Sequence, residues 1–195
     1  MGGIGLLIGS IGLILRGAFA GFTSVANGSN ADNSADMVLS LPTAGTTNRI
    51  SVAYPNIRPG GTVYRRFDLT AGGGLGAITM NTVAATTSLL DSDATNGLQM
   101  QIDKCSGSTQ PDGGWLEAGS TPDYTYSCPS GTTAPVVTTR SIIGSKVAVS
   151  NVSSGATNHL LLTVTLPTSS PTTMQSANSV IQYKFQADQR AAGPQ

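Results

Sequence analysis

The sequence has few charged residues. Lys, Arg, Asp and Glu together make up 10% of the 195 positions, and the formal net charge is zero. No stretch carries a run of like charges, so the chain lacks the basic face that nucleic-acid binding requires. It also lacks a cationic patch for an anionic membrane surface. We therefore expect no nucleic-acid partner, and membrane contact only through an uncleaved N-terminal segment.

Residues that commonly carry catalysis are also scarce. His159 is the only histidine, and neither an HExxH pair nor a GxSxG elbow occurs. Without partners nearby in the sequence, His159 is interpreted as a loop or strand-edge residue. Residues 91–96 include Asp91 and Asp93 but depart from calcium-loop spacing, with Ile102 where the closing glutamate would stand, so a solvated turn is predicted. The sequence thus predicts no enzyme, and no catalytic, cofactor or metal site.

The longest apolar run lies at the N-terminus. Residues 4–15 are almost wholly apolar, and small residues up to Ala20 have the spacing that a signal peptidase reads. We predict a helical signal peptide over residues 1–20, cleaved between Ala20 and Gly21, followed by one domain over residues 21–195. The run is short for a transmembrane helix, which needs about 20 apolar residues. No Lys or Arg precedes it, so an uncleaved anchor remains an alternative.

Cys105 and Cys128 are the only cysteines. An even pair in an exported chain predicts a disulfide, which would stabilise the fold by about 3 kcal/mol. The bracketed residues 105–128 are rich in Gly, Pro and Ser, which predicts an irregular excursion tied at its base. Trp115 is interpreted as the local core of this excursion, with ligand contact as the alternative. Two cysteines and His159 lack the spacing and the fourth ligand of a metal site.

Alternating apolar and polar residues predict an all-β fold. The clearest rows are near the C-terminus: Leu160, Leu162, Val164 and Leu166, then Ile181, Tyr183, Phe185 and Ala187. Further strands are predicted over residues 37–41, 50–54, 62–69, 78–83 and 98–103, with short extended pieces at 136–137, 142–143 and 147–149. A short helix or irregular crossing is expected over residues 84–93, with Leu89 and Leu90 turned inward. Roughly eight to ten strands at this spacing predict a two-sheet β-sandwich or jelly roll.

Several motifs, taken in order, resemble a known family. They are residues 17–24 at the export junction, the distance from there to residues 37–41, the Asn-Ile-Arg-Pro-Gly-Gly turn at residues 56–61, and the terminal residues 183–190. Together they resemble the TasA/camelysin family of secreted bacterial and archaeal surface proteins over nearly the whole mature chain. The cysteine-bracketed loop departs from the best-known members and is similar to versions from high-GC Gram-positive bacteria.

The resemblance implies an exported jelly roll, processed by a dedicated signal peptidase, that polymerises into fibres of a biofilm matrix. In such fibres the N-terminal segment of one subunit adds a strand to the next. Residues 21–30 would be that donor, with Phe22 and Val25 as its side-chain anchors; a disordered leader or an ordinary first strand is the alternative. The implied partners are further copies of the chain and other matrix or cell-wall components. The implied location is the extracellular matrix or the cell surface.

Two other function classes remain open. A monomeric surface adhesion module would use the loop over residues 105–128 and Trp115. A secreted metallopeptidase-like protein would follow the peptidase activity attributed to camelysin-like members. Zinc hydrolysis needs three protein ligands and an open position, and one histidine without HExxH supplies no visible ligand set. The sequence analysis therefore favours the structural role.

Overall fold

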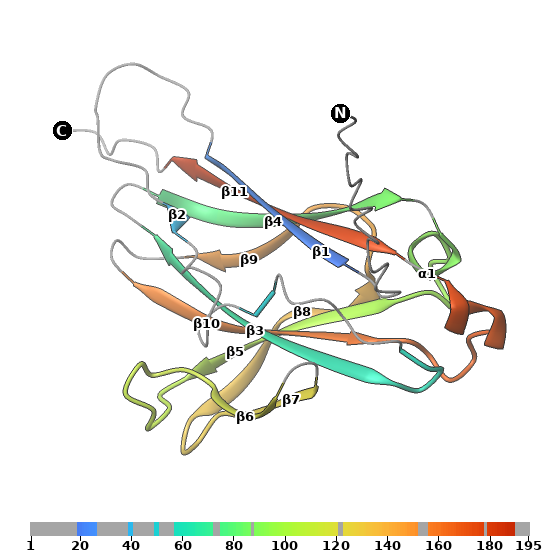
Figure 1. Cartoon of the computed structure of the whole chain (residues 1–195). Helices are drawn as coiled ribbons and strands as arrows, with labels where there is room; N and C mark the ends of the chain where they lie inside the picture. Colours follow the sequence, from blue (N-terminus) through green and yellow to red (C-terminus); the bar gives the residue numbers. More distant parts are fainter. Residues whose placement is uncertain are drawn as a thin grey trace, which may run out of the picture.

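The structure, a computed structural model, describes residues 19–26, 39–40, 49–50, 57–71, 75–86, 88–120, 123–151, 156–177 and 179–189. These residues form strands β1 to β11, the short helix α1 and the 3-10 helix η1. Two sheets pack face to face, and a small hairpin lies outside them (Figure 1). The predicted all-β sandwich is confirmed. Residues 1–18 of the predicted signal helix lie outside the described residues, while Phe19 and Ala20 begin strand β1.

The first sheet has four strands. In spatial order they are β1 (Phe19–Ala26), β11 (Val180–Gln189), β4 (Leu75–Thr86) and β9 (Val147–Asn151). Strand β11 pairs antiparallel with β4 on one side and parallel with β1 on the other. Ile181, Tyr183 and Phe185 are fully buried, as their alternation predicts. Strand β11 thus supplies one wall of the core.

The second sheet has five strands. In spatial order they are β2 (Leu39–Ser40), β3 (Thr62–Ala71), β10 (Thr157–Thr165), β5 (Gln99–Ser106) and β8 (Thr132–Ser141). Strand β10 is central and pairs antiparallel with β3 and β5. Its row Leu160, Leu162 and Val164 is fully buried, because strands flank it on both sides and the other sheet covers it. The two predicted C-terminal strands therefore lie in different sheets.

Aromatic and aliphatic side chains from both sheets form one core. The rings of Phe67 on β3 and Phe185 on β11 lie 5.7 Å apart between centroids, tilted by 53°, and both are fully buried. Burying one such side chain stabilises the folded state by about 1.5–3 kcal/mol. This contact joins the two sheets across the sandwich.

One end of the sandwich is closed by α1 (Leu89–Ser92), where Ser88 and Asp91 form a capping box. Leu90 is buried, as predicted, but Leu89 is 58% exposed, so its predicted inward orientation is wrong. A single helical turn has room for one inward apolar residue. Within the described part of the chain, no helix is long and apolar enough to cross a membrane.

The solvated turn predicted for residues 91–96 is present at Asp93 but not at Asp91. Asp93 accepts hydrogen bonds from the backbone N–H groups of Thr95 and Asn96, as an exposed Asx turn does. Asp91 is buried instead, and its carboxylate accepts hydrogen bonds from the backbone N–H of Ser88 at 3.0 Å and the hydroxyl of Ser179 at 2.5 Å. Asp91 therefore ties α1 to the segment that enters β11.

The cysteine-bracketed excursion is more regular than predicted. It contains a hairpin of β6 (Leu116–Ser120) and β7 (Asp123–Ser127) on the outer side of the five-stranded sheet (Figure 1). Gly119 has a positive φ of 88°, and a Cβ there would meet the Asp123 carbonyl oxygen at 2.3 Å. A glycine is needed at this position because only glycine adopts the conformation and leaves the space.

Candidate functional site

Strand β1 forms one edge of the four-stranded sheet. Strand β1 pairs parallel with β11 from Phe19 opposite Val180 to Ala26 opposite Ala187. In the described part of the chain β1 has a strand on one side only, and Figure 1 shows it along β11. An edge strand of this kind can be replaced by an identical strand from another chain without changing the backbone hydrogen bonds of the sheet.

Residues 21–26 of the predicted donor segment and both residues of the predicted cleavage site lie in β1, while residues 27–30 of the donor segment lie outside the described residues. The predicted cleavage between Ala20 and Gly21 would remove the first two residues of the strand and keep the pairs from Gly21 to Ala26. Phe22 lies in register with the buried Tyr183 and Val25 with Gln186. Cleavage and the anchor roles of Phe22 and Val25 stay predictions.

The four-stranded sheet also carries a cationic hollow. Its lining residues come from β4, β11 and the start of β9: Thr79, Asn81, Lys146, Lys184, Phe185 and Gln186. The Lys146 ammonium donates a hydrogen bond to the Gln186 side-chain carbonyl at 2.6 Å. Lys184 lies in register with Thr23 of β1, so the hollow is next to the edge of the sheet that β1 forms.

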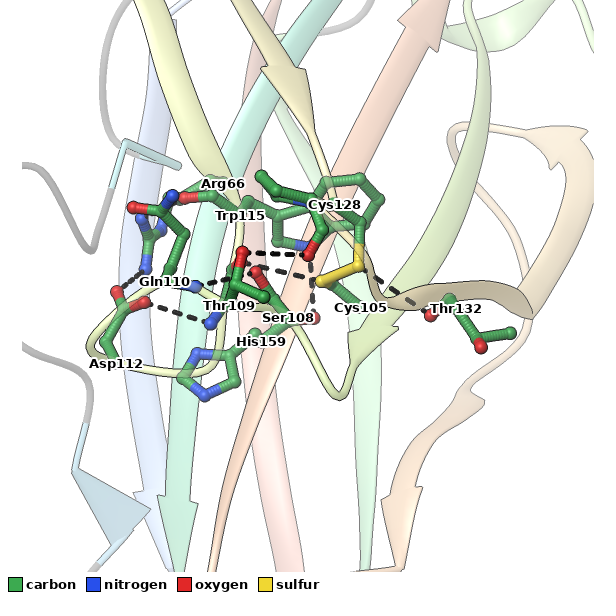
Figure 2. Close-up of a disulfide and its surroundings, with 12 residues drawn as sticks. Arg66, Cys105, Ser108, Thr109, Gln110, Asp112, Trp115, Cys128, Thr132 and His159 are labelled. Carbon is green, nitrogen blue, oxygen red and sulfur yellow. Dashed lines mark hydrogen bonds and ion pairs between the residues drawn. A yellow bond between two sulfur atoms is a disulfide. The ribbon is translucent and has the colours of Figure 1, made fainter.

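The predicted disulfide is present. Cys105 and Cys128 are bonded, with their Cα atoms 5.7 Å apart (Figure 2). Trp115 is 4% exposed and packs with Cys105 and Leu161. The indole N–H donates a hydrogen bond to the His159 carbonyl oxygen at 3.1 Å. The interpretation of Trp115 as a local core is therefore confirmed, and this core fixes the excursion to the sheet.

His159 lies inside the central strand β10, so its placement in a loop or at a strand edge was wrong. Strand register places it between Asp68 on β3 and Cys105 on β5. Neighbours in register across a sheet have Cβ atoms about 4.5–5.5 Å apart, so the three side chains form a row on the outer face. The excursion leaves this row at Cys105 and folds back over it. The side chain of His159 is 12% exposed.

The Arg66 guanidinium binds the carboxylate of Asp68, in this row, and that of Asp112, above it. Arg66 donates hydrogen bonds to the Trp115 carbonyl oxygen at 2.6 Å, to Asp112 Oδ2 at 2.5 Å and to Asp68 Oδ2 at 3.3 Å. Asp112 Oδ1 accepts the backbone N–H of Gly114 at 2.9 Å. Burial opposes ionisation of Asp112, but these hydrogen bonds prevail and lower its pKa. Figure 2 shows the Arg66 guanidinium pointing toward Asp112, with His159 nearby.

Asp68, Asp112 and His159 form the one group of possible metal ligands found in the described residues. Their ligand atoms all lie within 4.8 Å of one another. Sequence analysis missed this group because its members come from β3, the excursion and β10. The available signal was that Asp68 falls on the polar face of one predicted strand and that His159 directly precedes another. Their opposition depends on strand register, which alternation does not specify.

A second ionic contact holds the hairpin. Arg49 donates hydrogen bonds to both carboxylate oxygens of Glu117, at 3.0 and 2.8 Å, and the Tyr126 hydroxyl donates to Glu117 at 2.9 Å. Burial opposes ionisation of Glu117, but the two donors prevail and lower its pKa. Burial and the hydrogen bond to Glu117 raise the pKa of Tyr126. This contact joins the hairpin to the segment that precedes β3.

No protein-family model matches the chain, and no curated protein matches it. The resemblance to the TasA/camelysin family therefore rests on the sequence motifs alone and stays a prediction.

Proposed function

We propose that this chain is an exported structural protein of the cell surface or extracellular matrix, and that its subunits join by exchange of β1. The observation that carries the proposal is the parallel pairing of β1 with β11 at the edge of the four-stranded sheet. In the assembly, β1 of one subunit occupies the same position beside β11 of the next. The motifs that resemble the TasA/camelysin family support the same role.

The energetics of exchange favour this edge. Backbone hydrogen bonds lost within one subunit are regained between two, because the donated strand is identical to the strand that it replaces. Release of β1 leaves the Phe67–Phe185 contact between the sheets in place. The disulfide and both ionic contacts lie with the other sheet. These contacts of the acceptor therefore do not depend on β1.

The adhesion alternative is less well supported. It depends on Trp115 as a contact residue, but Trp115 is buried against the disulfide and donates its N–H within the chain. Leu116 is the large apolar side chain exposed beside it, at 43%. One exposed leucine is ordinary for a protein surface.

Cysteine trapping in register tests strand exchange. One preparation carries Thr23→Cys, a tagged second preparation carries Lys184→Cys, and the two positions are partners in the β1–β11 register. The proteins are unfolded and refolded together with the native disulfide kept oxidised. Exchange predicts disulfide-linked pairs that contain one chain of each kind. The proposal would be overturned if the mixture gave no mixed pairs while the Thr23→Cys/Lys184→Cys double variant formed its new disulfide only within one chain.

A matched control uses Thr139→Cys in place of Lys184→Cys. Thr139 is exposed on β8, an edge strand of the other sheet. Mixed pairs should not form with this partner.

Electron microscopy of the protein beginning at Gly21 should show fibres, and deletion of residues 21–30 should leave monomers. Fibres that persist after the deletion would refute the assignment of β1 as the donor.

A further inference from the structure

The row beneath the excursion contains buried polar atoms without hydrogen bonds. They include Oδ1 of Asp68 and Nδ1 of His159, which lie 3.1 Å apart, within ion-pair distance but outside hydrogen-bond geometry. The Asp68 side chain is 5% exposed. A buried carboxylate oxygen without a hydrogen bond loses the stabilisation that water gives it in the unfolded chain. Something that contacts both atoms would remove this cost.

The distance and the misalignment fit a shared metal ion. Ligand atoms bound about 2.1 Å from a tetrahedral metal ion lie about 3.4 Å from each other, so a shift of a few tenths of an ångström would admit the ion. Such an ion would lie to one side of the line that joins the two atoms. A proton on Nδ1 would favour the opposite arrangement, with the N–H directed along that line at Oδ1.

The local charge also calls for a cation. Asp68 and Asp112 contribute two negative charges, and Arg66 contributes one positive charge. With a neutral imidazole, the group carries a net negative charge in a largely buried location. The Arg66 guanidinium binds one oxygen of each carboxylate and leaves Oδ1 of Asp68 without a hydrogen-bond partner. It thereby orients the ligands as an outer-shell group does.

We propose that Asp68, His159 and Asp112 bind a divalent transition-metal ion of the zinc class. Imidazole nitrogen and carboxylate oxygen are ligands that zinc accepts, and three protein ligands leave one position for water. Asp112 is 37% exposed, which gives the ion a route from solvent. Because Asp68 and His159 belong to the sheet and Asp112 to the excursion, the ion would fix the excursion to the sheet. The role is structural and independent of strand exchange.

The single histidine makes the test direct. Untagged purified protein is stripped with chelator and titrated with Co²⁺ and then with Zn²⁺. One Co²⁺ ion per chain should give visible d–d absorption and shift the one imidazole signal in the NMR spectrum. No free cysteine is present among the described residues, so thiolate ligands cannot produce this absorption. Zn²⁺ should displace Co²⁺ and reverse the paramagnetic shift.

Substitutions identify the ligands. His159→Gln and Asp68→Asn should each weaken Co²⁺ binding by at least about tenfold. The control is Asp103→Asn, because Asp103 is on the neighbouring strand β5 and interacts with Gln101 outside the ligand group. This control should keep the affinity of the original chain. Equal affinity in all four proteins would overturn the proposal.

Asp112→Asn removes one ligand and should keep the chain folded, because Asp112 lies in the partly exposed excursion. Saturating Zn²⁺ should raise the melting temperature of the original chain and leave that of this variant unchanged, with both folded by near-ultraviolet circular dichroism. Absence of Co²⁺ and Zn²⁺ binding, or an equal rise in melting temperature in both proteins, would overturn the proposal. Either result leaves the exchange of β1 to be judged by its own experiment.

Discussion

Arg49 and Glu117 form a two-pronged ion pair between segments far apart in the chain. The nitrogen–oxygen distances are 3.0 and 2.8 Å, and the side chains are 20% and 16% exposed. Paired N–H donors in this geometry bind a carboxylate more strongly than a single contact does. Tyr126 adds a third hydrogen bond to the same carboxylate. The hairpin is therefore fixed by a polar contact as well as by the Trp115 core.

Glu117→Gln should lower the free energy of unfolding by about 1–2 kcal/mol, because it removes the charge from a partly buried carboxylate that accepts three hydrogen bonds. Denaturant unfolding followed by fluorescence measures the change. Asp123→Asn is the matched control, since Asp123 is exposed on the same hairpin. An equal loss in both variants would show that the ion pair contributes nothing specific.

The stability should fall at acid pH through the same carboxylate. Hydrogen bonds from Arg49 and Tyr126 outweigh burial and hold the pKa of Glu117 below its ordinary value. The unfolded chain therefore binds the proton more tightly than the folded chain. The contribution of Glu117 is complete above about pH 4.5 and is lost as the pH falls through the lower, folded pKa. Denaturant midpoints measured across this range should fall less steeply in Glu117→Gln.

Tyr126 should add a loss of stability at alkaline pH. Burial and the hydrogen bond that its hydroxyl donates to Glu117 raise the pKa of this phenol. The stabilisation is complete below the unfolded pKa of about 10 and is lost as the pH rises toward the folded value. Ultraviolet titration should show a phenol that ionises above about pH 10, and Tyr126→Phe should remove that late step. Ionisation of all tyrosines together would contradict this prediction.

The two sheets could be predicted from sequence because their strands have one buried face. The apolar row of β11 alternates with polar residues, as does that of β10 except at Leu161, and both rows are buried as expected. The hairpin β6–β7 was missed because β6 has no apolar row and mostly faces solvent, and because β7 offers only the pair Tyr124 and Tyr126. Pro135 lies inside β8, which is possible because β8 is an edge strand.

The groups under the excursion could not be predicted, for a different reason. Asp68 and His159 meet because β3 and β10 pair in one particular register, and a shift of one residue would place them on opposite faces. Asp112 joins them only because the disulfide and Trp115 turn the excursion back over the sheet. Alternation predicts which residues share a face of a strand, while tertiary pairing decides which of them touch.

Loss of the disulfide should destabilise the chain strongly. Cys105 and Cys128 are 23 residues apart, and the cross-link restricts the unfolded chain. Replacing both by Ser should lower the free energy of unfolding by about 3 kcal/mol, as measured in denaturant. The same variant should expose Trp115, with a red-shifted emission spectrum. Unchanged emission would show that the local core folds without the cross-link.

Gly114 should be intolerant of any side chain. A Cβ at this position would lie 2.7 Å from Nδ1 and 2.8 Å from Cγ of His159, and the ring cannot retreat because β10 is flanked on both sides. Gly114→Ala should therefore push the excursion away from the row and lower the melting temperature. Gly144→Ala is the matched control, because the added methyl would meet only the flexible end of Arg140. If the two variants have the same melting temperature, the close approach of the excursion to His159 is not required for stability.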